Sequence, residues 1–131
     1  MQTTEVVKLL DGVTADTTGN NAYVGDAERV CFLLTCADHS SGNGVFTFNG
    51  GVGSDIHTTA PTTVALNVIT TNVANTNGET ILRTTGVTLN SNTSVLLWLD
   101  LKEFPVQFIN CAVDVTTDGT YTCWMCKLIK D

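Results

Sequence analysis

Short apolar segments separated by polar turns run along the whole chain. Within the segments valine, isoleucine, leucine, phenylalanine and threonine predominate and often alternate with polar residues, as in β-strands. The gaps between them are rich in glycine, asparagine, aspartate and serine. Eight candidate strands follow from this pattern, at residues 4–10, 29–38, 44–49, 63–72, 79–89, 94–101, 106–116 and 120–130. No window of a dozen residues has the period and capping residues of an amphipathic helix, so the pattern predicts an all-β fold without significant helix.

About eight short strands without a repeat period are typical of a compact two-sheet β-sandwich or jelly roll. The strand from Val95 to Leu99 is apolar on both faces, which places it in the middle of a sheet. The length of 131 residues suits a single domain with one core. We expect residues 27–131 to form the body of the sandwich and residues 1–26 to form an N-terminal strand and a polar loop.

The N-terminal segment allows two interpretations. In the first, its apolar residues form an ordinary first strand, and the polar residues 11–26 form a loop. In the second, the strand is a capsid-binding arm that leaves the body and pairs with the sheet edge of a neighbouring molecule. The apolar side chains that such an arm would present are Val6, Val7, Leu9 and Leu10.

The dipeptide Asp118-Gly119 is a strong signal for a two-residue β-hairpin turn. In a hairpin closed by this turn, residues equally far from the turn on the two strands are paired. This pairing puts Cys111 directly opposite Cys126. We therefore predict that Cys111 and Cys126 form either a disulfide or a pair of buried thiols. Synthesis in a reducing cytoplasm favours the thiols.

The five cysteines do not indicate a disulfide framework, because their number is odd and the chain begins without a signal-peptide pattern. Cys123-Trp-Met-Cys126 has the C-x-x-C spacing of redox and zinc sites. Its flanks are typical of a strand, in which residues three apart point to opposite faces. We therefore interpret both cysteines as small apolar side chains and predict neither a metal nor another cofactor.

No motif indicates an enzyme. His39 and His57 lie in polar, loop-like surroundings, and no nucleophile elbow is present. Carboxylates that could act as acid and base are those of Asp55, Asp100, Glu103 and Asp114, but any acidic β-sandwich offers similar pairs. The polar loop at 11–26 has oxygen ligands for calcium without the EF-hand pattern.

Four aromatic side chains bear on the surface chemistry. Trp98 and Trp124 lie within apolar strands, so we predict that both belong to the core. Tyr23 and Tyr121 are the better candidates for exposed rings that could stack on a sugar.

Composition excludes several classes of protein. A hydrophobic content of 43% with 15% charged residues argues against intrinsic disorder. Thirteen Asp and Glu against six Lys and Arg give a net charge of −7, which argues against binding nucleic acid. No apolar run approaches the ~20 residues that span a bilayer, so we expect no membrane contact. A surface dominated by threonine, asparagine, serine and glycine, with few lysines and glutamates, suits a chain packed against copies of itself or a partner shell.

Several stretches of the sequence look like parts of small structural proteins of tailed bacteriophages, most of all head decoration (cement) proteins. The stretches that carry this resemblance lie at residues 27–35, 39–48, 73–83, 94–101 and 116–122. The resemblance covers about residues 27–130. It lies in the character and order of these segments and includes no diagnostic motif, so it transfers no functional residue.

The resemblance implies a β-sandwich that forms a homotrimer on the capsid exterior of a virion made in the host cytoplasm. Its partner would be the major capsid protein, whose neighbouring subunits it would clamp. The alternative is a phage tail or adsorption module that binds glycans of the host surface through loops and exposed aromatic rings.

Overall fold

The computed structural model describes residues 3–52, 64–66, 68–71 and 81–130. Within these ranges the chain forms twelve strands and no helix, which confirms the all-β prediction. In chain order the strands are β1 (Thr4–Val13), β2 (Thr17–Thr18), β3 (Ala22–Tyr23), β4 (Ala27–Ala37), β5 (Gly42–Gly51), β6 (Val64–Ala65), β7 (Val68–Thr71), β8 (Ile81–Thr84), β9 (Gly86–Leu89), β10 (Thr93–Asp100), β11 (Phe108–Thr117) and β12 (Thr120–Ile129). Each of the eight predicted strands has a counterpart, and two of them are split in two.

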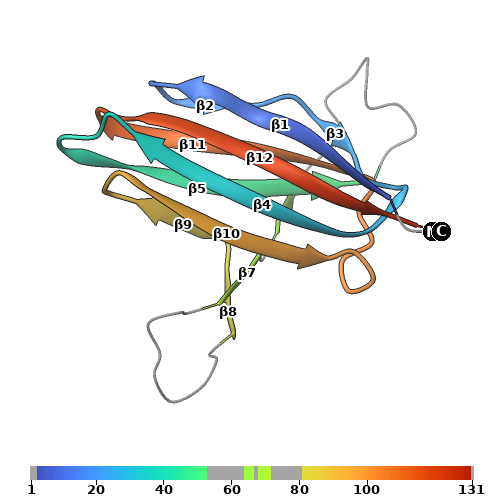
Figure 1. The fold of residues 1–131 in the computed structure, drawn as a ribbon. Coiled ribbons are helices and arrows are strands. Elements are labelled where there is room, and N and C mark those ends of the chain that lie inside the picture. Colours follow the sequence, from blue (N-terminus) through green and yellow to red (C-terminus); the bar gives the residue numbers. More distant parts are fainter. Residues whose placement is uncertain (1–2, 53–63, 67, 72–80, 131) are drawn as a thin grey trace.

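The strands form two antiparallel sheets that pack face to face, as the two-sheet prediction requires (Figure 1). The first, sheet A, has the order β1-β12-β4-β10-β7-β8. The second, sheet B, is built on β11 and β5, with β2 and β3 beside β11 and with β6 and β9 beside β5. The long strands β12 and β4 are central in sheet A, and they carry the face described below.

The core lies between the two sheets. From Val30 to the end of β4 the side chains at even positions are buried and those at odd positions are partly or fully exposed, as expected for a strand with one face inward. Phe32 of sheet A meets Phe48 of sheet B with ring centroids 4.2 Å apart. Phe46 packs edge-on against Tyr121 at 5.8 Å. Burying each such ring contributes roughly 1.5–3 kcal/mol, so these pairs help to hold the two sheets together.

The predicted hairpin across Asp118-Gly119 is wrong. β11 pairs with β5, and β12 pairs with β4 and β1, so the turn connects the two sheets instead of two paired strands. β11 and β12 each present an apolar face to the space between the sheets, and pairing with separate sheets buries both faces. Within the turn the Tyr121 hydroxyl donates a hydrogen bond to the Asp118 carbonyl at 3.1 Å.

The carboxylate of Asp118 fastens this turn to the connection between β4 and β5. It accepts hydrogen bonds from the backbone N–H groups of Ser40 and Ser41, at 3.0 and 3.1 Å, and from the Ser40 hydroxyl. These donors hold the pKa of Asp118 at about 2. Two loops that are far apart in the sequence are thus joined at one end of the sandwich.

The N-terminal segment packs against the rest of its own chain. β1 is the edge strand of sheet A and pairs with β12 along its length, and β2 and β3 pair with β11. A shift of register after Lys8 lets the consecutive side chains of Leu9 and Leu10 both enter the core. The N–H of Ile129 donates to the carbonyl of Thr3, which ties the two ends of the chain together. Residues 3–26 therefore supply strands to both sheets.

Candidate functional site

The outer face of sheet A carries large apolar side chains that are exposed to solvent. Val6 is 59% exposed, Leu33 38%, Leu96 63% and Trp124 36%. They come from the four neighbouring strands β1, β4, β10 and β12. An antiparallel sheet in a sandwich usually presents polar residues on its outer side, and a contiguous exposed apolar patch indicates a binding surface. We refer to this surface as the outer apolar face.

Strand register explains why these residues meet. Directly paired residues point to the same side of a sheet, so each pairing extends a row across the face. One row runs through Lys8, Trp124, Leu33 and Leu96. The next row runs through Val6, Cys126, Cys31 and Trp98.

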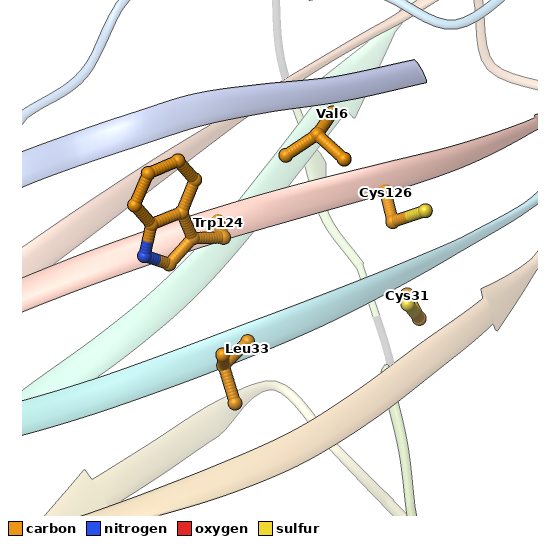
Figure 2. A pocket seen from close by; sticks show the side chains of 5 residues that line it. All are labelled: Val6, Cys31, Leu33, Trp124 and Cys126. Atoms are coloured by element: carbon orange, nitrogen blue, oxygen red, sulfur yellow. The ribbon is translucent and has the colours of Figure 1, made fainter. Parts of the chain in front are cut away.

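A shallow hollow of about 280 Å³ lies in the middle of the outer apolar face. Figure 2 shows the five side chains that line it, Val6, Cys31, Leu33, Trp124 and Cys126. The lining is almost entirely apolar, so the hollow would favour an apolar side chain of a partner over a polar ligand.

Two cations lie over the two indole rings of the face. The Lys8 ammonium is 4.2 Å from the centre of the Trp124 ring, and the Arg29 guanidinium is 5.9 Å from that of Trp98. Such contacts contribute about 0.5–1 kcal/mol at exposed sites. They restrain the orientation of both indoles.

Of the predicted arm residues, only Val6 contributes an exposed side chain to this face. Leu9 and Leu10 are buried in the core, and Val7 is partly buried against it. The structure therefore divides the predicted group between the inner and outer sides of sheet A.

Cys111 and Cys126 are not brought together. Cys126 lies on the outer apolar face opposite Cys31, whereas Cys111 lies in sheet B opposite Phe48. The Cys111 thiol contacts that of Cys123 across the core, and this contact and burial raise the pKa of Cys111 well above its usual range. The prediction for Cys111 and Cys126 fails because it depended on the hairpin.

Three of the predictions for aromatic residues are also wrong. Trp124 and Trp98, expected in the core, lie on the outer side of sheet A. Tyr121, expected at the surface, is fully buried. In β12 the residues at odd positions, Tyr121 among them, point into the sandwich, so Trp124 points out. Both sides of this strand are apolar, and the sequence pattern does not reveal which side is inner.

Tyr23 is 48% exposed, which confirms that prediction. It borders a more polar hollow of about 200 Å³ near the ends of β3 and β12, together with Gly25, Pro105, Gln107 and Lys130 among others. An exposed ring beside polar groups is the arrangement that sugar stacking requires.

Two of the residues considered for catalysis, His39 and Asp100, have local structural contacts. The ring of His39 contacts the Gly42 carbonyl at 2.8 Å through Nε2, and its backbone N–H donates to Asn92. Asp100 accepts a hydrogen bond from the backbone of Lys102. Asp55 and His57 lie outside the described residues. In the described ranges, no three metal-ligating side chains gather, and no helix is long and apolar enough to cross a membrane.

The whole sandwich is similar to a known structure. The crystal structure of the SPBc2 prophage-derived protein YomS superposes with a TM-score of 0.68, over 99% of this chain and 96% of that chain, at 10% sequence identity. At that identity the likeness shows a shared fold. No protein-family model matches the sequence, and no curated protein matches it significantly.

Proposed function

We propose that this chain is a structural protein of a bacteriophage particle that acts by binding and not by catalysis. In its specific form, the proposal is a head decoration protein that sits on the capsid exterior as a homotrimer and clamps neighbouring major capsid subunits. The resemblance of the sequence to phage structural proteins and the fold shared with a prophage-derived protein support the phage assignment.

The observation that carries the proposal is the outer apolar face. Its four side chains are between 36% and 63% exposed, so covering each of them with a partner would contribute roughly 0.5–2 kcal/mol. Tryptophan is enriched among residues that dominate binding energy, and Trp124 lies beside the central hollow. Modest affinity at each contact is sufficient on a shell, because a trimer that binds several subunits at once gains effective concentration.

Co-sedimentation with empty shells tests this proposal. Shells assembled from the major capsid protein of the same genome are mixed with the purified chain and spun through a gradient. We expect the chain to move with the shells, and light scattering to give three times the mass of one chain. A monomer that stays at the top of the gradient would contradict the proposal.

Variants connect the binding to the outer apolar face. Val6→Asp and Leu96→Asp each place a charge in it and should weaken shell binding about tenfold, which corresponds to ~1.4 kcal/mol. Val52→Asp is the control, because Val52 is a valine of comparable exposure, at 68%, that does not line the central hollow. Equal loss in all three variants would argue against this face as the docking surface.

The exposed ring of Tyr23 favours a second candidate, a tail or adsorption module that binds glycans. In that case a glycan array should give a signal that Tyr23→Ala abolishes and Tyr23→Phe retains, because the aromatic stacking surface is the same in both rings. The gene neighbourhood separates the candidates, since a capsid gene alongside supports the first and a tail-fibre gene the second.

A further inference from the structure

Two thiols from neighbouring strands face each other on the outer apolar face. Cys31 of β4 is the direct partner of Cys126 of β12 in the antiparallel register. Both are partly exposed and line the central hollow, where Figure 2 shows them on adjacent ribbons. The other three cysteines, Cys36, Cys111 and Cys123, are buried.

We propose that Cys31 and Cys126 form an oxidation site, in which a peroxide converts the two thiols into a cross-strand disulfide. With hydrogen peroxide the reaction balances in two steps. One thiol loses its proton, and the thiolate attacks a peroxide oxygen. The O–O bond breaks, a sulfenic acid forms, and the departing hydroxide takes up the released proton as one water. The second thiol then loses its proton and attacks the sulfenic sulfur as the thiolate. The S–S bond forms, the S–O bond breaks, and the departing hydroxide takes up that proton as a second water.

The geometry of paired strands meets the requirement for the bond. Directly opposed residues in antiparallel strands have Cα atoms about 4.5–5.5 Å apart. Disulfides span Cα separations of about 4.4–6.8 Å, so Cys31 and Cys126 can be joined with little movement of the backbone.

Access to the oxidant distinguishes this pair from the other pair of neighbouring thiols. Cys111 and Cys123 are also in contact, but both are completely buried between the sheets. A dissolved peroxide meets Cys31 and Cys126 first, because they line a hollow that opens to solvent.

The protonation of Cys31 sets the pace of the reaction. Burial, together with the neighbouring Cys126 thiol, raises the pKa of Cys31 above its usual value. Because the thiolate is the attacking form, the pair should stay reduced in neutral, reducing conditions and oxidise faster as the pH rises. The reaction does not depend on the proposed function. If that function is correct, the pair would be reduced during assembly and oxidised after release from the cytoplasm.

Peptide mapping of the full-length chain tests the proposal directly. The chain is purified in reductant, transferred to hydrogen peroxide, alkylated, denatured, and cut with trypsin and chymotrypsin without reduction. Cleavage after Arg29, Phe32, Trp124 and Lys127 should release the peptide 30–32 linked to the peptide 125–127. This separates Cys31 from Cys36 and Cys126 from Cys123, so the bond is assigned without ambiguity.

The expected result is the 30–32 to 125–127 link in the wild-type chain, its loss in Cys31→Ser, and its retention in the control Cys111→Ala. The rate should increase about tenfold between pH 7 and pH 8, as the thiolate fraction does below the pKa. A bond between Cys111 and Cys123, a bond between two chains, unlinked thiols after oxidation, or a rate independent of pH would overturn the proposal. The wild-type map decides even if a variant fails to fold.

Discussion

The ammonium group of Lys127 lies 3.1 Å from a carboxylate oxygen of Asp26, with the lysine side chain only 5% exposed. The same ammonium donates to the Tyr23 carbonyl at 2.9 Å, and Glu5 lies 3.8 Å away. The buried cation thus fastens the loop between β3 and β4 to the end of β12. A charge in this position is tolerated only because its partners replace water.

We expect Asp26→Ala to destabilise the fold by about 1–3 kcal/mol, because a buried charged donor loses its charged acceptor. Urea denaturation gives the free energy of unfolding without screening the pair. The matched control is Asp11→Ala, whose partner Lys8 is also 3.0 Å away but in an exposed pair, for which a loss of at most ~1 kcal/mol is expected. Equal losses in the two variants would show that burial of Lys127 does not set the energy of the pair.

Removal of the Asp118 contacts should change how stability depends on pH. The native pKa of Asp118, about 2, lies below the ordinary value of 3.8. Its contribution is therefore complete above pH 3.8 and is lost as the pH falls through about 2. Asp118→Asn should flatten the decrease in unfolding temperature over this interval. Asp114→Asn removes the same charge from an exposed position of β11 and should leave the slope unchanged. Parallel curves for the wild type and Asp118→Asn would contradict this account.

Gly119 is required by the connection between the sheets. Its φ is +114°, and an added Cβ would lie 2.7 Å from the hydroxyl oxygen of the buried Tyr121. Gly119→Ala should therefore cost roughly 1–3 kcal/mol of stability. Gly86→Ala should be neutral or slightly stabilising, because a Cβ there meets nothing closer than 3.7 Å. Thermal unfolding of the two variants measures the difference, and a stable Gly119→Ala would show that the turn can adopt another conformation.

Leu96 and Leu97 are neighbours in β10 that should behave in opposite ways. Leu97 is fully buried, and Leu97→Ala should cost about 2–5 kcal/mol through the cavity that it leaves. Leu96 is 63% exposed, so Leu96→Ala should change the free energy of unfolding by no more than about 0.5 kcal/mol. Denaturant midpoints of both variants test whether the outer apolar face is dispensable for folding. A large loss for Leu96→Ala would give that face a structural role.

The predictions for single residues show how much of the candidate site can be predicted from the sequence. Tyr23 is exposed as expected, although its neighbours Ala22 and Val24 pack into or against the core. Trp124 is exposed and Tyr121 is buried, which is the reverse of the prediction. The two residues lie on opposite faces of β12, and both faces of this strand are apolar. The outer apolar face was not anticipated, although a signal existed, because β12 and β10 carry apolar residues at both odd and even positions.

The alternation of apolar and polar residues by itself determined the all-β class, the positions of the long strands and the placement of the turns. These properties are local, since side-chain direction and turn geometry depend on residues close together in the chain. Only the tertiary structure decided that the Asp118-Gly119 turn crosses between sheets, and that Cys126 therefore faces Cys31 instead of Cys111. Pairing of distant strands depends on which apolar faces can be buried together. The burial of all the core side chains together decides which strands pair, and a single turn does not.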